Sequence, residues 1–194
     1  PSEMPSTFDA EALKAQAVCA RTFVYSQMKN TQYALYGANI DNTTAFQVYN
    51  ASETKQSTDE AVKATAGQVV SCGRSLITCY YFSTSAGKTE DMEVWSSSTP
   101  DFIHKVESVD DNSPYYRWSS ELDLSAYNDP QYGTATGISV DKTSDAGYVL
   151  SLTINYGNKS QTITAENDIR KALGHYQKKV TLNDGSVREN MSMI

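Results

Sequence analysis

The chain has 194 residues, of which 39% are hydrophobic and 20% are charged, so it has enough apolar side chains to form a buried core. Its formal net charge of −7 and pI near 4.8 argue against nucleic acid as a partner, because phosphate binding needs clustered Lys and Arg. The sequence has no run of about eighteen apolar residues that could span a membrane.

Residues 9–29 give the strongest helix signal in the sequence. Apolar residues recur at three- and four-residue steps from Leu13 to Met28, and Asp9 is suited to cap the helix N-terminus. Several alanines in the first half keep this helix thin, which is typical of a buried central helix packed closely against its neighbours.

Three ionisable residues are candidates for function, one before this helix and two within it. Pro5 restricts the residue before it to extended backbone, so Glu3 is expected on a fixed turn, which suits acid/base chemistry. A Glu near a helix start is more often only a favourable charge for the helix dipole. Lys14 and Arg21 are two turns apart and project from one side; they either bind a ligand, or Lys14 extends from the core to water and Arg21 forms a structural salt bridge.

The next elements are a second helix and a hairpin. Residues 57–66 carry a capping box at Ser57 and are closed by Gly67. Residues 69–72 and 76–82 are then rich in β-branched and aromatic side chains on either side of a turn at Gly73.

Residues 83–88 are small and polar and predict a tight loop, and residues 96–136 predict irregular structure with short helices. A three-stranded antiparallel meander is expected at 137–140, 148–156 and 160–163, followed by a short helix that is capped by Thr164 and ended by Gly174. The sequence therefore predicts an α+β fold, with a central Ala-rich helix packed with the hairpin and the meander and two lobes flanking a groove. We expect one catalytic domain with lobes at about 1–95 and 96–194.

The cysteines and histidines do not form a metal-binding pattern. Cys19, Cys72 and Cys79 are far from the spacing of a zinc site with His104 or His175. The hairpin turn pairs residue 72 with residue 75, which disfavours a disulfide within the hairpin, so we expect free thiols.

Pairs of neighbouring acids could supply the two carboxylates of a glycosidase. Two such groups are Glu90-Asp91-Glu93 and Asp110-Asp111. Adjacent acids are far more often part of a solvated surface, and that is the interpretation favoured here.

Five segments in the same order carry a resemblance to a known family: PSEMPSTFDAEALKAQAVCARTFVYSQM, EAVKATAGQVV, YYFSTSAGKTEDMEVW, SPYYRW and ENDIRKALG. They resemble the stage II sporulation protein D family of lytic transglycosylases over nearly the whole chain, and the first segment is highly specific. The resemblance implies an extracytoplasmic location in the cell envelope. It also implies that an N-terminal region with a membrane anchor has been removed from this sequence.

The resemblance also assigns roles to residues. Glu3 matches the family's catalytic glutamate, and Lys14 and Arg21 match helix residues of its active-site groove, where we expect them to hold substrate rather than contact Glu3. The remaining substrate-binding residues implied are Ser83, Thr84, Ser85, Gly87 and the tyrosine of SPYYRW, assigned to Tyr116 with Tyr115 as the alternative.

One departure from the family concerns metal binding. Some relatives carry Cys, His and Cys between the first and second helices as a zinc site, but Asp41, Ala45 and Phe46 stand at those positions here. The resemblance therefore implies no zinc and no other cofactor for this chain.

The activity implied is cleavage of the β-1,4 bond between N-acetylmuramic acid (MurNAc) and N-acetylglucosamine (GlcNAc) in peptidoglycan glycan strands, leaving 1,6-anhydro-MurNAc ends. The expected setting is engulfment during sporulation, on strands stripped of peptides, with sporulation protein P, an amidase, and sporulation protein M as partners. Two alternatives are a non-catalytic glycan-binding module of the amidase-enhancer kind and a muramidase-type hydrolase in which water is the nucleophile.

Overall fold

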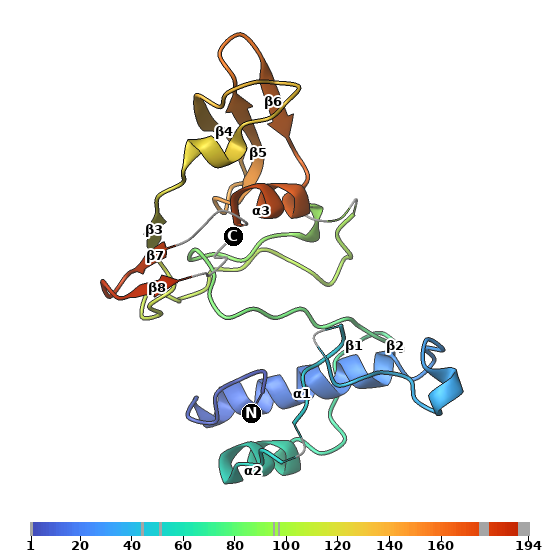
Figure 1. Ribbon diagram of the computed structural model, residues 1–194. Coiled ribbons are helices and arrows are strands. Elements are labelled where there is room, and N and C mark those ends of the chain that lie inside the picture. Colours follow the sequence, from blue (N-terminus) through green and yellow to red (C-terminus); the bar gives the residue numbers. More distant parts are fainter. Residues whose placement is uncertain are drawn as a thin grey trace. The chain divides into compact units, whose positions relative to one another are not determined.

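The computed structural model describes residues 2–43, 45–50, 52–94, 96, 98–174 and 179–189. This part of the chain combines helices with small antiparallel sheets (Figure 1), so the α+β class predicted from the sequence is confirmed. The chain divides into two compact units, Pro1–Tyr81 and Phe82–Ile194. That these units act as one catalytic domain stays a prediction.

Helix α1, Ala10–Ser26, begins where the sequence predicts it. Asp9 is the N-cap, and its carboxylate accepts a hydrogen bond from the amide of Glu11 at 2.9 Å, which satisfies one of the free N–H groups of the first turn. Within this helix only Leu13 and Thr22 are buried. Its alanine-rich surface is therefore less enclosed than a central helix was expected to be.

Helix α2, Gln56–Ala64, runs beside α1 (Figure 1) and begins before the predicted capping box. Lys55 is its N-cap, and the expected capping role of Ser57 is wrong, because the Ser57 hydroxyl instead donates to the carbonyl of Ser6 at 2.7 Å. This bond joins α2 to the turn that precedes α1. Gly67 has a φ of +77°, which suits the chain reversal that follows the helix.

The predicted hairpin is present but short. Strands β1, Ser71–Cys72, and β2, Ser75–Leu76, pair antiparallel, and Cys72 lies opposite Ser75 as the turn chemistry predicts. Buried Thr22 joins α1 to the segment before β1, because its hydroxyl accepts from the amide of Val70 at 2.9 Å. The first unit also has a short 3₁₀ helix, η1, Ala34–Tyr36.

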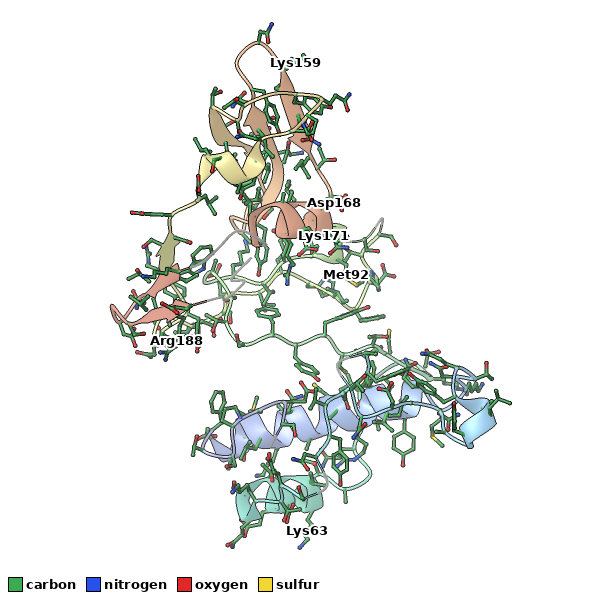
Figure 2. The ribbon with its side chains drawn as sticks, in the orientation of Figure 1. Lys63, Met92, Lys159, Asp168, Lys171 and Arg188 are labelled. Atoms are coloured by element: carbon green, nitrogen blue, oxygen red, sulfur yellow. The ribbon has the colours of Figure 1, made fainter. Side chains whose placement is uncertain are left out.

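The second unit contains the predicted meander. Strands β4, Gly137–Thr143, β5, Val149–Asn155, and β6, Ser160–Ile163, pair antiparallel in that order. Helix α3, Glu166–Gly174, packs against β5, and its Asp168 and Lys171 point outward in Figure 2. The buried core cluster of this region is Tyr127, Ala135, Leu152, Ile154, Tyr156 and Ile169.

A second sheet was not predicted. Strands β3, Trp118–Ser120, β7, Lys179–Leu182, and β8, Val187–Glu189, pair antiparallel in the order β3-β7-β8. Arg188 lies on β8 (Figure 2). The strands are short and β3 is far from β7 in sequence, so local periodicity could not reveal their pairing. Of the two 3₁₀ helices described in this unit, η2, Met92–Val94, lies before residues 96–136, and η3, Leu124–Tyr127, lies within them, as expected for a region of irregular structure with short helices.

None of the helices in the described part of the chain combines the length and hydrophobicity that a membrane crossing requires.

Candidate functional site

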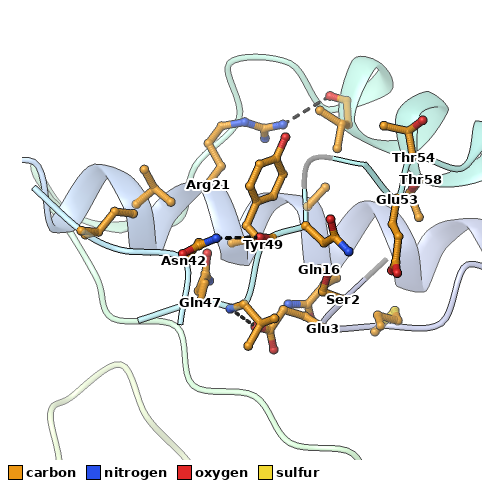
Figure 3. A pocket seen from close by; sticks show the side chains of 18 of the residues that line it. Ser2, Glu3, Gln16, Arg21, Asn42, Gln47, Tyr49, Glu53, Thr54 and Thr58 are labelled. Atoms are coloured by element: carbon orange, nitrogen blue, oxygen red, sulfur yellow. Dashed lines mark hydrogen bonds between the residues drawn. The ribbon is translucent and has the colours of Figure 1, made fainter. Parts of the chain in front are cut away.

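The first unit contains a cavity of about 1250 Å³ bordered by α1, α2 and the loop between them (Figure 3). On the α1 side its wall includes Ala17 and Ala20, whose short side chains leave room next to the helix. The side chains that bring polar or aromatic groups to the cavity include Glu3, Gln16, Arg21, Gln47 and Tyr49.

Glu3 lies next to a defined turn at one edge of this cavity. The amide of Phe8 donates to the carbonyl of Pro5 at 3.1 Å and closes the turn that leads into α1. The bond from Ser57 to the Ser6 carbonyl attaches the same turn to α2. Glu3 therefore lies directly before a turn that is attached to both α1 and α2.

The Glu3 side chain is exposed, yet two groups of the protein hold its carboxylate. The amide of Val48 donates to Oε1 of Glu3 at 2.9 Å. The pKa of Tyr81 is raised above its usual value first by burial and then by the negative charge of Glu3, to which its hydroxyl donates. Gln47 donates to the Tyr81 hydroxyl at 3.4 Å, so Glu3 and Tyr81 share a polar cluster.

Sequence reasoning missed Tyr81 and Gln47 as members of this cluster, and Gln16 as a polar residue that lines the cavity. A signal existed for Gln16, because it is a polar residue within the apolar stripe of α1, three residues after Leu13 and four before Ala20. No comparable signal distinguishes Tyr81 from the other tyrosines, since its position depends on the fold of the chain after β2.

Arg21 connects α1 to the end of α2. Its guanidinium donates to the carbonyls of Thr65 at 2.8 Å, Gln68 at 2.9 Å and Val62 at 3.3 Å. The last carbonyls of a helix lack partners within the helix, so Arg21 supplies donors that the end of α2 needs. The structural alternative for Arg21 anticipated a salt bridge, whereas the described contacts are with backbone carbonyls and one threonine hydroxyl.

Lys14 lies apart from the Glu3 cavity. Its ammonium contacts Oε1 of Glu11 at 2.7 Å, and it borders a second cavity of about 420 Å³ together with Thr65 and Gln68. Arg21 also contacts Thr65 and Gln68, so the two cations lie near the same end of α2. The predicted role of Lys14 in substrate binding stays a prediction.

The other predicted substrate-binding residues belong to the second unit, where the structure brings them together. Gly87 has a φ of +101°, and a Cβ added there would lie 3.1 Å from the Tyr116 hydroxyl. Only glycine fits this conformation and this close approach without strain. Tyr116 is thus the tyrosine of SPYYRW that packs on the 83–87 loop, and the Arg117 guanidinium lies 5.5 Å from the centre of its ring.

Asp41 and Phe46, which stand where some relatives have zinc ligands, make other contacts. The Tyr33 hydroxyl donates to Asp41 at 2.5 Å, which lowers the pKa of that carboxyl, and the Phe46 ring lies 6.0 Å from the Tyr33 ring. Among the residues that the structure describes, no group of three or more His, Cys, Asp or Glu side chains is arranged to hold a metal ion. His175 lies outside the described residues.

The three cysteines are free thiols, as predicted. Burial and the neighbouring Cys79 thiol raise the pKa of Cys19 from 9.0 to about 11. Cys19 and Cys79 therefore lie close together, one on α1 and the other two residues before Tyr81.

A carboxylate next to a turn and beside a cavity, with a tyrosine hydroxyl and amide side chains around it, is the arrangement of an acid/base or polar-ligand site. Residues 1–71, which include Glu3 and both helices, match the family model described as Stage II sporulation protein. The chain belongs to the stage II sporulation protein D family.

Three relatives illustrate this similarity. Stage II sporulation protein D of Bacillus subtilis (strain 168) is 32% identical, and the match covers 89% of this chain and 54% of the relative. The protein of the same name from Bacillus amyloliquefaciens is 30% identical with the same coverage. An amidase enhancer of B. subtilis is 43% identical over 123 residues, which are 63% of this chain and 16% of the relative.

The chain thus spans about half the length of the stage II sporulation protein D relatives that it matches. Membership of this family, together with the similarity to an amidase enhancer, supports a sporulation function related to the cell wall.

Proposed function

We propose that this chain is a lytic transglycosylase that cleaves the MurNAc–GlcNAc bond of peptidoglycan glycan strands and leaves 1,6-anhydro-MurNAc ends. The observation that carries the proposal is the position of Glu3, directly before this turn, at the edge of a cavity of about 1250 Å³ and in contact with Tyr81. Family membership supports the cell wall as the place of action.

One carboxylate is enough for this reaction, because the sugar supplies the nucleophile. The Glu3 carboxylic acid gives its proton to the oxygen between the two sugars as the bond from that oxygen to the muramic anomeric carbon breaks. The Glu3 carboxylate then takes the proton of the muramic 6-hydroxyl, whose oxygen bonds to the same carbon. An intramolecular hydroxyl has a high effective molarity, so the step needs no bound water.

The contacts of Glu3 suit this cycle. The Val48 amide fixes one carboxylate oxygen at 2.9 Å, and the Tyr81 hydroxyl donates to the carboxylate form. Both donors stabilise the charged product of the first proton transfer and hold the group in place for the second. Tyr81 and Val48 are therefore proposed to orient Glu3 during turnover.

The cavity has room for an extended ligand. Its volume exceeds the roughly 300 to 1,000 Å³ of ordinary small-molecule pockets, and it offers the rings of Tyr25 and Tyr49 to the flat faces of sugars. The Arg21 guanidinium is proposed to bind carbonyl or lactyl groups of the substrate, in addition to its hydrogen bonds to the end of α2. The further substrate-binding residues in the proposal are Lys14, Ser83, Thr84, Gly87 and Tyr116, together with Ser85, whose buried side chain belongs to the same loop without reaching the glycan.

The biological setting is proposed as well. It comprises an extracytoplasmic location, attachment to the membrane through an N-terminal anchor region, and strands whose peptides sporulation protein P has removed, with sporulation protein M as a further partner. The amidase connection has independent support in the 43% identity to an amidase enhancer.

That identity also favours a second candidate, a module that binds glycan for a partner amidase without cutting it. Digestion of peptide-free glycan strands by this chain and by Glu3→Gln, followed by mass analysis, distinguishes the possibilities. Anhydro ends made by the wild type alone support the transglycosylase, and reducing ends, heavier by one water, indicate a muramidase. Binding without any cleavage would replace the enzyme by the binding module.

A further inference from the structure

Asp110 gathers three hydrogen bonds on one carboxylate oxygen. Its Oδ2 accepts from the amide of Ser85 at 2.8 Å, from the hydroxyl of Ser85 at 2.5 Å and from the hydroxyl of Ser108 at 2.9 Å. The Ser85 hydroxyl is the main cause that holds the pKa of Asp110 below its usual value, although partial burial acts in the opposite direction. Asp110 is therefore a half-buried acid bound by the protein, and the interpretation of these acids as solvated surface is wrong for buried Glu90.

The hydroxyl of Ser85 is committed to the protein itself. Ser85 is only 3% exposed, and a hydroxyl has a single proton to donate, which here goes to Asp110. The same oxygen accepts from the amide of Gly87 at 3.2 Å. A chain of hydrogen bonds thus runs from Asp110 through Ser85 to Gly87.

Gly87 is the point where this chain meets Tyr116. The Gly87 carbonyl accepts from the amide of Ser108 at 3.0 Å, and the Tyr116 hydroxyl lies against the open side of the glycine. The position of the loop backbone at Gly87 therefore decides where the Tyr116 ring can lie. Asp110 acts on Tyr116 through two intermediate residues without touching it.

The downstream end of the loop has a separate anchor. The amide of Thr89 donates to the carbonyl of Val106 at 2.8 Å, and the carboxylate of Glu90, 1% exposed, contacts the Lys105 ammonium at 3.0 Å. These contacts do not involve Asp110. Loss of Asp110 should consequently loosen residues 83–87 while the rest of the segment stays in place.

We propose that Asp110 and Ser85 are positioning residues, which set the shape of the 83–87 loop and hold Tyr116 for the glycan strand. The inference rests on the proposed function, because it states which groups of this region meet the glycan. Ser83, which is exposed, and Tyr116 make the contacts, and Ser85 acts through the backbone that it holds.

The test measures binding of peptide-free glycan strands separately from their cleavage, with Glu3→Gln as the common background for binding. Asp110→Ala and Ser85→Ala should each weaken binding by roughly 10-fold, and Asp110→Asn, which keeps an acceptor but loses the charge, by roughly 3-fold. The matched control is Asp111→Ala, which removes the neighbouring exposed carboxylate and should leave binding unchanged. The double variant Asp110→Ala with Ser85→Ala should bind no more weakly than Asp110→Ala alone, because both remove the same chain of bonds.

Amide hydrogen exchange at Ser85 and Gly87 provides the second readout. Exchange should become faster in Asp110→Ala and, at Gly87, in Ser85→Ala, with circular dichroism showing that the fold is kept. If Asp110→Ala does not fold, Asp110→Asn and Ser85→Ala decide the question. Glycan binding as strong as that of the wild type in all of these variants overturns the inference. Weak binding in Ser85→Ala with normal binding in the Asp110 variants also overturns it, because Ser85 would then be a direct ligand.

The two proposals fail in different ways. Absence of anhydro ends in the wild-type digest overturns the transglycosylase, while the binding series still tests Asp110. Anhydro ends together with unchanged binding in the Asp110 and Ser85 variants overturn only the positioning role.

Discussion

The carboxylate of Glu3 accepts a hydrogen bond from the amide of Val48 at 2.9 Å, although the two residues are 45 positions apart in the chain. The Glu-Met-Pro turn before α1 and the loop between α1 and α2 therefore form one polar site. The loop supplies a backbone group, so the nature of the side chain at position 48 matters less than the presence of its N–H.

This distinction can be tested with two substitutions at one position. Val48→Pro removes the N–H and should lower the rate of anhydro-end release by about 10-fold, because one donor to the Glu3 carboxylate is lost. Val48→Ala keeps the N–H and serves as the control, with a rate close to wild type. Equal rates in the two variants would show that this hydrogen bond has no role in turnover.

Arg21 has a structural role that can be separated from binding. Arg21→Ala leaves the carbonyls of Val62, Thr65 and Gln68 without the guanidinium and should lower the free energy of unfolding by roughly 2 to 3 kcal/mol, measured in urea. Lys14→Ala breaks a surface pair with Glu11 and should cost less than about 1 kcal/mol. A loss of turnover in Arg21→Ala without any loss of stability would instead assign Arg21 to substrate alone.

Much of the fold followed from local patterns in the sequence. The N-cap at Asp9, the hairpin register at Cys72 and the three meander strands were all predicted, since each depends on near neighbours in the chain. The capping box at Ser57 failed because a tertiary partner, the Ser6 carbonyl, competes for the serine hydroxyl. The β3-β7-β8 sheet was missed because its strands are short and pair across a long stretch of sequence.

The site was predicted in part, and for a comparable reason. Motif and resemblance indicated Glu3, Arg21 and Tyr116, but motifs do not show which groups a side chain contacts. The bond from Arg21 to the end of α2 and the contact of Tyr81 with Glu3 depend on distant parts of the chain. In the same way, the Asp-Asp pattern suggested surface acids, whereas Asp110 binds Ser85.

The role of Tyr81, which the sequence did not indicate, can be tested directly. Tyr81→Phe keeps the ring but removes the hydroxyl that donates to the Glu3 carboxylate, so turnover should fall by roughly 5-fold while glycan binding changes little. Steady-state kinetics on soluble glycan fragments would show this as a lower kcat with KM unchanged. Tyr80→Phe, at the exposed neighbouring tyrosine, is the control and should behave as wild type.

Cys19 should show the behaviour of a half-buried thiol that stays protonated. With its pKa raised to about 11, the folded protein keeps this thiol neutral at pH values where the unfolded chain, with a pKa near 9.0, has lost the proton. The stabilising contribution is therefore complete below pH 9.0 and is lost as the pH rises towards 11. Between pH 8 and 11, the free energy of unfolding measured in urea should fall less for Cys19→Ala than for the wild type. An identical fall in the two proteins would contradict the raised pKa of Cys19.

The last prediction concerns Glu90 and Lys105, which anchor the downstream end of the 83–87 loop. Burial alone would raise the pKa of Glu90, but hydrogen bonds from Ser144 and Lys105 hold it below the usual value, so this carboxylate is charged in the folded protein. Glu90→Gln leaves Lys105 without its main partner and should lower the free energy of unfolding by about 3 kcal/mol. A group whose pKa is depressed by folding stabilises the protein above its ordinary pKa and loses this effect as the pH falls. The difference in the free energy of unfolding between the wild type and Glu90→Gln should therefore shrink when the pH is lowered through about 4. A difference that stays constant would show that the charge of Glu90 is not its cause.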